Sequence, residues 1–154
     1  MIRGQFATIV LGSIATVVLG VSGFAVAQET SVKQKMGENF AATQIILTSL
    51  MTSSYTAVPD QVAIIADHAS YLMHAVPDSA EQDRDQFLAY AYNLQGHTRD
   101  LKSITEQLIE QDEAQASGKP LETNDLREAA AAHYGGMVTT CVACHNHFRP
   151  QAAQ

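Results

Sequence analysis

Four stretches of the chain repeat apolar residues at alternating spacings of three and four, and this feature restricts the fold more than any other. Such spacing places side chains on one stripe of a helix that packs against neighbouring helices. The stretches cover roughly residues 32–50, 60–76, 87–108 and 125–144. Short connections between successive helices favour antiparallel neighbours. We therefore expect an all-α protein, an antiparallel up-down-up-down four-helix bundle.

The apolar positions of these stripes are the expected core. They are Val32, Met36, Phe40, Thr43, Leu47 and Leu50 in the first stretch, Val62, Ile65, Ala69, Leu72 and Val76 in the second, Phe87, Ala91, Leu94, Thr98, Leu101, Ile104 and Leu108 in the third, and Leu126, Ala130, His133, Met137, Cys141 and Cys144 in the fourth. Met51 and Met73 follow the same spacing and are expected in the core too. Pro77 marks the end of the second helix, because proline cannot continue the hydrogen-bond ladder.

The first 27 residues have the pattern of a secretory signal peptide. Arg3 is followed by an uncharged apolar run over residues 6–27, which ends in Ala25-Val26-Ala27. Small residues at both alanine positions suit cleavage after Ala27, which leaves residues 28–154 as one mature domain without membrane insertion. The alternative is an uncleaved membrane anchor, since the run is just long enough to span a bilayer. In either case the folded part lies outside the cytoplasm.

Charge and motif content exclude several classes of function. The chain has 16 acidic and 9 basic residues, a net charge of −7. This balance disfavours nucleic acid as a partner; it keeps a secreted domain soluble and favours encounter with basic patches on other proteins. The sequence contains no nucleophile and base arrangement, no paired carboxylates on an inward face and no phosphate-binding glycine loop. We therefore expect a protein that is not an enzyme.

The segment Cys141-Val142-Ala143-Cys144-His145 carries the chemistry. The pattern Cys-x-x-Cys-His indicates a covalent haem attachment site. On a helix, positions i, i+3 and i+4 share a face, so two thiols can bond to the vinyl groups of one porphyrin while the adjacent imidazole reaches the iron. We expect one haem c, bound through Cys141 and Cys144, with His145 as the proximal iron ligand.

Other uses of two cysteines remain open at this point. A thioredoxin-like redox pair also uses Cys-x-x-Cys, although no βαβ pattern surrounds this one. A zinc site would recruit Cys141, Cys144, His145 or His147, although no second cysteine pair exists. A structural disulfide over three residues of a helix would be strained.

The ending Cys-x-x-Cys-His-x-x-Phe-Arg, at residues 141–149 of a four-helix pattern, resembles the class II cytochromes c, the cytochrome c′ family of the bacterial periplasm. The resemblance covers essentially the whole mature chain. The segment from Asp67-His68-Ala69 to Val76-Pro77 is similar to that family's second helix. The resemblance implies a periplasmic haem protein, and it implies that Arg149 contacts a haem propionate. His147 departs from the pattern, because the family often has an acidic residue there.

The family resemblance implies one of two residues on the distal side of the haem. Met36 in the first helix is the candidate sixth ligand, and a methionine–histidine pair is typical of electron transfer. The register is open, because Val32-Lys33-Gln34-Lys35 stands where the family usually has an Arg-Gln pair before the distal residue. One turn later, Phe40 would leave a five-coordinate iron that binds NO or CO under a bulky lid.

The leading hypothesis is a periplasmic one-electron carrier that serves redox partner proteins. We expect none of His68, His74, His97 and His133 to bind the iron: His133 lies on the inward stripe, and the other three are expected at the surface or partly buried. Related bundles are often homodimers that pack through their first two helices. An apolar flank for such a dimer would be formed by Ala41, Ala42, Ile45 and Ile46.

Overall fold

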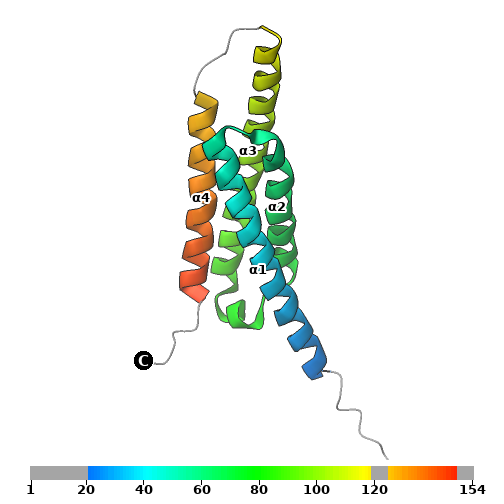
Figure 1. Ribbon diagram of the computed structural model, residues 1–154. Coiled ribbons are helices and arrows are strands. Elements are labelled where there is room, and N and C mark those ends of the chain that lie inside the picture. The colour runs from blue at the N-terminus through cyan, green and yellow to red at the C-terminus, as the bar shows by residue number, and fades with distance from the viewer. Residues whose placement is uncertain (1–20, 119–124, 149–154) are drawn as a thin grey trace, which may run out of the picture.

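The computed structural model describes the backbone of residues 21–118 and 125–148, and their side chains from residue 32 onward. The elements in this part of the chain are α1 (Val21–Thr52), the 3₁₀ helix η1 (Tyr55–Ala57), α2 (Val58–His74), the 3₁₀ helix η2 (Asp78–Asp83), α3 (Arg84–Ala116) and α4 (Asp125–Phe148). No strand occurs among these residues. The prediction of an all-helical fold is confirmed for the described ranges. The four long helices lie side by side as a helical bundle (Figure 1).

The helices do not contact one another equally. α3 packs extensively against both α2 and α4, and α1 packs mainly against α2. α1 and α4 touch only sparsely. The side of the bundle between α1 and α4 is therefore the least closed.

Two groups of apolar side chains form the core. The larger group consists of Ala42, Ile46, Tyr55, Val58, Val62, Ile65, Ala69, Leu94, Leu101, Leu108, Ala130 and Met137. The smaller group, at the end of the bundle where α2 leads into α3, consists of Leu72, Val76, Ala80 and Phe87. The predicted stripes of the second and third helices are confirmed, except that Thr105 is buried and Ile104 only partly so.

The predicted stripe of the first helix is wrong in register. Phe40 and Leu47 were expected inside, but they are 66% and 41% exposed. The buried residues of α1 are Asn39, Ala42, Ile46 and Ser49. This set also follows helical spacing, but two of its members are polar. The apolar pattern therefore pointed to a stripe one position away from the buried one.

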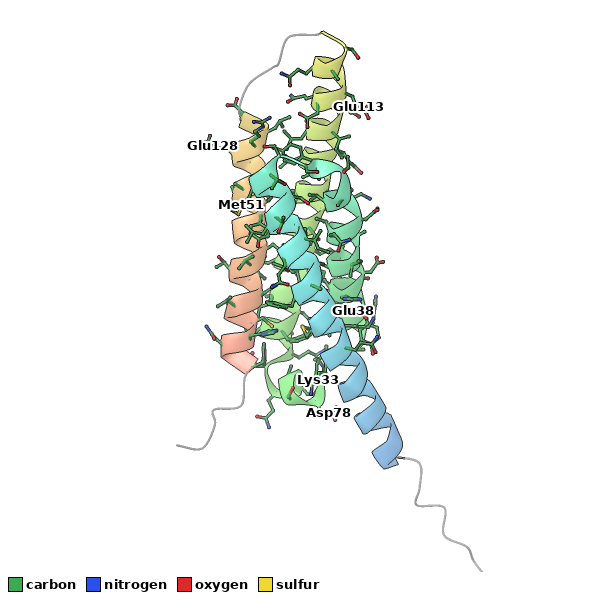
Figure 2. The ribbon with its side chains drawn as sticks, in the orientation of Figure 1. Lys33, Glu38, Met51, Asp78, Glu113 and Glu128 are labelled. Carbon is green, nitrogen blue, oxygen red and sulfur yellow. The ribbon has the colours of Figure 1, made fainter. Side chains whose placement is uncertain are left out.

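The other corrections concern methionines and the proposed dimer flank. Met51, expected in the core, is 78% exposed in the last turn of α1 (Figure 2). Met73 is partly buried, and Met137 is fully buried as expected. Two residues of the predicted flank, Ala42 and Ile46, belong to the core instead. The differences at Met51 and in the predicted flank have one cause, because the register of α1 decides which of its apolar residues remain outside.

The end of α1 follows from backbone hydrogen bonding. Ser53 has a φ of 54°, the Ser54 N–H donates to the Ser49 carbonyl at 2.9 Å, and the Ser53 N–H donates to the Leu50 carbonyl at 3.4 Å. This arrangement is the Schellman motif, which normally has glycine at the left-handed position. α2 then begins at Val58 rather than near Asp60, and Pro59 lies in its first turn. Proline is tolerated there because that N–H needs no helical partner.

The predicted signal peptide falls largely outside the described residues, which begin at Val21. The backbone of α1 runs through the predicted cleavage point after Ala27, and its first turns project beyond the other helices (Figure 1). Among the described residues, none of the helices combines the length and the apolar character that crossing a bilayer requires.

Candidate haem-attachment site

A cavity of about 380 Å³ lies between α1, α3 and α4. This volume is within the range of small-molecule and cofactor sites. Its walls are mostly apolar, and they consist of Met36, Asn39, Phe40 and Thr43 from α1, Phe87, Tyr90, Ala91 and Leu94 from α3, and Val138, Thr140, Cys141, Val142, Cys144, His145 and Asn146 from α4. The cavity therefore lies on the side where α1 and α4 pack least.

The cavity brings together the residues that the sequence singled out. α4 continues without a break through the motif to Phe148, so Cys141, Cys144 and His145 keep the i, i+3, i+4 spacing of a regular helix. All three line the cavity, and Met36 lines it from α1. Cys141 and Cys144 are partly buried, whereas His145 is exposed. Arg149 lies outside the described residues.

The two cysteines are free thiols in different apolar surroundings. Cys141 packs against the larger core group and Cys144 against the smaller one. Burial raises the pKa of Cys141. Burial, together with the neighbouring Cys141, raises the pKa of Cys144 to about 11. Both side chains are therefore neutral thiols near pH 7. A redox-exchange cysteine needs the opposite, a lowered pKa.

The two distal candidates, Met36 and Phe40, both line the cavity. Met36 is partly buried and packs against the smaller core group. Phe40 follows one turn later on α1, and most of its side chain is exposed. The assignment of Met36 rather than Phe40 as the distal residue stays a prediction.

The end of α4 is fixed by contacts that the sequence did not indicate. The ring of Phe148 meets Phe87 edge-on, with ring centroids 5.5 Å apart. His147 Nε2 lies 2.6 Å from Asp83 Oδ2, which ties α4 to η2. These contacts anchor the helix that carries the cysteines against the α2–α3 connection. No sequence pattern links Asp83 to position 147, because 64 residues separate them.

A polar cluster on the α1 wall was also missed. Asn39 lines the cavity, and its Oδ1 is 2.7 Å from Nδ1 of His68. The other ring nitrogen, Nε2, lies 3.2 Å from Oε2 of Glu38. His68 is only 8% exposed, so the expectation of a surface or partly buried histidine is wrong. Burial, followed by the charge of Lys35, lowers the pKa of His68 below its ordinary value.

The remaining histidines lie away from the cavity lining. His74 is exposed, and His97 and His133 are partly buried. The rings of His97 and His133 meet edge-on with centroids 5.7 Å apart. Within the described part of the chain, His133 Nδ1 has no hydrogen-bond partner, and Oδ2 of Asp100 lies 3.9 Å from it. His97 packs on Gly136, where a Cβ would collide with the imidazole ring.

Within residues 21–118 and 125–148, no three His, Cys, Asp or Glu side chains gather as a ready-made metal site. Comparisons of the chain with protein families, with curated proteins and with solved structures find no match.

Proposed function

We propose that this protein is a periplasmic c-type cytochrome of the class II kind, an up-down-up-down four-helix bundle with one covalently attached haem c that carries single electrons. Cys141 and Cys144 form the thioether bonds, and His145 is the proximal iron ligand. Met36 is the distal ligand. The observation that carries the proposal is the single cavity that Cys141, Cys144, His145 and Met36 all line.

The cavity suits a flat, mostly apolar macrocycle. Apolar side chains such as Phe87 and Leu94 form its inner wall, and the sparse contact between α1 and α4 leaves an opening on one side. In forming each thioether, the thiol adds across a vinyl double bond, with sulfur bonding to one carbon and hydrogen to the other. The raised pKa values of the two thiols reflect their partly buried, apolar surroundings.

When bound, haem supplies reversible one-electron exchange at iron. The residues of this chain would bind the haem and hold it in position for that exchange. His145 would hold the iron through a ring nitrogen, and the contact of His147 with Asp83 holds the end of α4 in position. A histidine–methionine pair favours electron transfer over ligand binding. Phe40 and Val142, both exposed at the cavity, mark where an edge of the macrocycle would meet a redox partner protein.

Location and partners belong to the same proposal. The signal-like residues 1–27 support export, and the projection of the first turns of α1 beyond the bundle is compatible with their removal. A homodimer through α1 and α2 would bury Ile45, Leu47 and Met51 of α1 and Ile64 of α2, all exposed here. The acidic net charge favours redox partners with basic patches. Electron carriage is the whole activity, so the protein is not an enzyme on this proposal.

One observation favours a second candidate function, capture of NO or CO at a five-coordinate iron. Phe40 lines the same cavity as Met36 and lies one helical turn further along α1. If Phe40 rather than Met36 covers the iron, the sixth position stays open. The bulky ring would then restrict access to small diatomic ligands.

The test is production of the full chain with the haem-attachment machinery, followed by absorption spectroscopy of the purified protein. We expect haem that stays attached on a denaturing gel, and a reduced spectrum of low-spin, six-coordinate type that ignores added CO. Prompt CO binding by the reduced protein would replace electron carriage with the second candidate. Absence of haem would remove both and leave a haem-free Cys-x-x-Cys redox or zinc module.

Matched variants sharpen the assignment of the attachment residues. The double variant Cys141→Ala with Cys144→Ala should lose covalent haem altogether. His145→Ala should lose the low-spin spectrum, whereas His74→Ala should keep it, because His74 is exposed and does not line the cavity. A full low-spin spectrum in His145→Ala would show that another residue holds the iron.

A further inference from the structure

His68 is held between two oxygen atoms of α1. Its Nδ1 faces Asn39 Oδ1 at 2.7 Å and its Nε2 faces Glu38 Oε2 at 3.2 Å. Only the protonated imidazolium carries a hydrogen on each ring nitrogen, so only that form makes both contacts as hydrogen bonds. The neutral ring has a single N–H. One of the two contacts must therefore change when His68 loses its proton.

The two partners differ in what they can do. The ionised carboxylate of Glu38 accepts hydrogen bonds and cannot donate one, whereas the amide of Asn39 has an accepting Oδ1 and a donating Nδ2. A rotation of the amide by 180° exchanges these two atoms. Neutral His68 is therefore best satisfied when it keeps its proton on Nε2, facing Glu38, while Asn39 turns and donates from Nδ2 to the bare Nδ1.

This rotation reaches the candidate site. Asn39 is buried, and it lines the cavity together with Met36, which precedes it by three residues on α1. Within the described part of the chain, the side chain of Asn39 makes no hydrogen bond other than the one to His68. The second end of its amide is thus available to a group bound in the cavity.

We propose that the protonation state of His68 selects which end of the Asn39 amide faces the cavity. The amide offers a hydrogen-bond donor when His68 is protonated and an acceptor when His68 is neutral. His68 is thus a positioning residue that acts through Asn39. The inference rests on the proposed function only for the identity of the bound group, the haem with its distal ligand.

The charges around His68 set the pH at which the amide turns. Lys35 and Glu38 face the ring from α1, and Asp67 lies beside it on α2. Burial and then the charge of Lys35 lower the pKa of His68 from 6.5, against the opposite effects of Glu38, of a hydrogen bond with the backbone of Lys35, and of Asp67. The acceptor end therefore faces the cavity at neutral pH, and the donor end replaces it on the acid side of pH 6.5.

The test is a ¹⁵N nuclear magnetic resonance titration of the whole protein, which follows both ring nitrogens of His68 and the side-chain amide of Asn39. We expect Nδ1 to lose its proton while Nε2 keeps its own, and the Asn39 amide signals to move with the same midpoint. Deprotonation at Nε2, or an Asn39 amide that stays unchanged while His68 titrates, overturns the proposal.

Two variants serve as controls in the same titration. In E38Q the side chain at position 38 can also donate, so the fixed choice of Nε2 should be lost. H74Q alters an exposed histidine of the same helix and should leave the Asn39 step unchanged. Persistence of the wild-type pattern in E38Q would contradict the role given to Glu38.

The reduction potential of the bound haem tests whether the Asn39 amide affects the group in the cavity. It should change over the pH interval in which His68 titrates, and H68Q should remove that change. A potential without this pH-dependent step overturns the link from Asn39 to the bound group. If the protein proves to contain no haem, the proposed function fails, but the titration of His68 and Asn39 still decides the amide rotation.

Discussion

Met36 decides between the two candidate functions. It is partly buried, packs against the smaller core group and lines the cavity opposite the cysteines. A thioether in this setting can fill core space or bind iron, and both uses bury it equally. The two uses differ in chemistry, so under the proposed function the spectrum of the bound haem distinguishes them.

Replacement of Met36 by alanine should convert the low-spin spectrum to a high-spin one. The variant removes the sulfur that would occupy the sixth position, so the reduced protein should bind CO promptly. Met51→Ala is the matched control, since Met51 belongs to the same helix but is exposed and absent from the cavity. An unchanged low-spin spectrum in Met36→Ala means that Met36 is not the ligand.

Ser53 has a backbone conformation that is unfavourable for a residue with a Cβ. It ends α1 with a φ of 54°, a left-handed conformation that costs a residue with a Cβ about 1 kcal/mol relative to glycine. Ser53→Gly should therefore raise the free energy of unfolding by about that amount, as measured by urea denaturation. Ser54→Gly should bring no gain, because Ser54 has a φ of −111°. Equal effects of the two substitutions would exclude this explanation.

The α3–α4 pair is the element-scale unit on which the site depends. α3 supplies Phe87, Tyr90 and Leu94 to the cavity, and α4 supplies the cysteines. Gly136 of α4 faces the ring of His97 on α3, and a Cβ at this position would collide with that ring. The absence of a side chain at position 136 lets α4 pack on α3 in the register that points its cysteines into the cavity.

Gly136→Ala should destabilise the protein by about 1–3 kcal/mol, because the new Cβ collides with a packed ring and forces the helices apart. Gly135→Ala is the neighbouring control. A Cβ at position 135 meets nothing within 4 Å, so that variant should gain up to about 1 kcal/mol from helix propensity. Thermal or urea unfolding measures both. A stabilised Gly136→Ala would show that His97 moves aside without cost.

The four helices of the described residues close the bundle unequally. α3 is well packed on two sides, whereas α1 and α4 scarcely touch. A four-helix protein without a cofactor would be expected to close this side with large apolar residues. Here two partly buried thiols, Cys141 and Cys144, line the cavity. Under the proposed function a haem fills this cavity, and the titration of Cys144 tests whether it is attached.

Stability at alkaline pH should depend on haem attachment. Burial raises the pKa of Cys144 from 9.0 to about 11, so in haem-free protein the unfolded thiol ionises first. The free energy of unfolding should then fall as the pH rises from about 9 to about 11, with no effect below that range. Cys144→Ala should lose only its own share of this loss, because burial also raises the pKa of Cys141. The haem-bearing protein, in which neither sulfur titrates, should lack the share of both cysteines. Urea unfolding across the range measures it.

Oligomeric state is a property of the whole surface. Leu47 and Met51 leave apolar surface on the outer face of α1. If a dimer forms through this face, Leu47→Glu brings like charges together and should weaken it at least tenfold, about 1.4 kcal/mol. Tyr92→Glu alters an exposed residue of α3 and should have no effect. Analytical ultracentrifugation measures the monomer–dimer equilibrium of both variants and of the wild-type protein. A wild-type protein that is monomeric at all concentrations would contradict the dimer proposal.

The amino-acid sequence by itself determined the helices and the motif. Apolar spacing predicts the stripes of α2, α3 and α4, since periodicity and propensity are local properties that one segment carries alone. The spacing of Cys141, Cys144 and His145 likewise needs only a continuous helix. Residues 1–27 and Arg149 keep the status of predictions, because the structure does not describe residues 1–20 or 149–154.

Tertiary structure decided the register of α1 and the surroundings of the site. Asn39 is buried because it pairs with His68, 29 residues away, and His147 meets Asp83 across an even longer separation. Apolar periodicity predicts burial only for apolar residues, so it misses a polar residue that is buried because its partner lies on another helix. Such long-range pairs form only when the helices pack, so they cannot be recognised from any single segment.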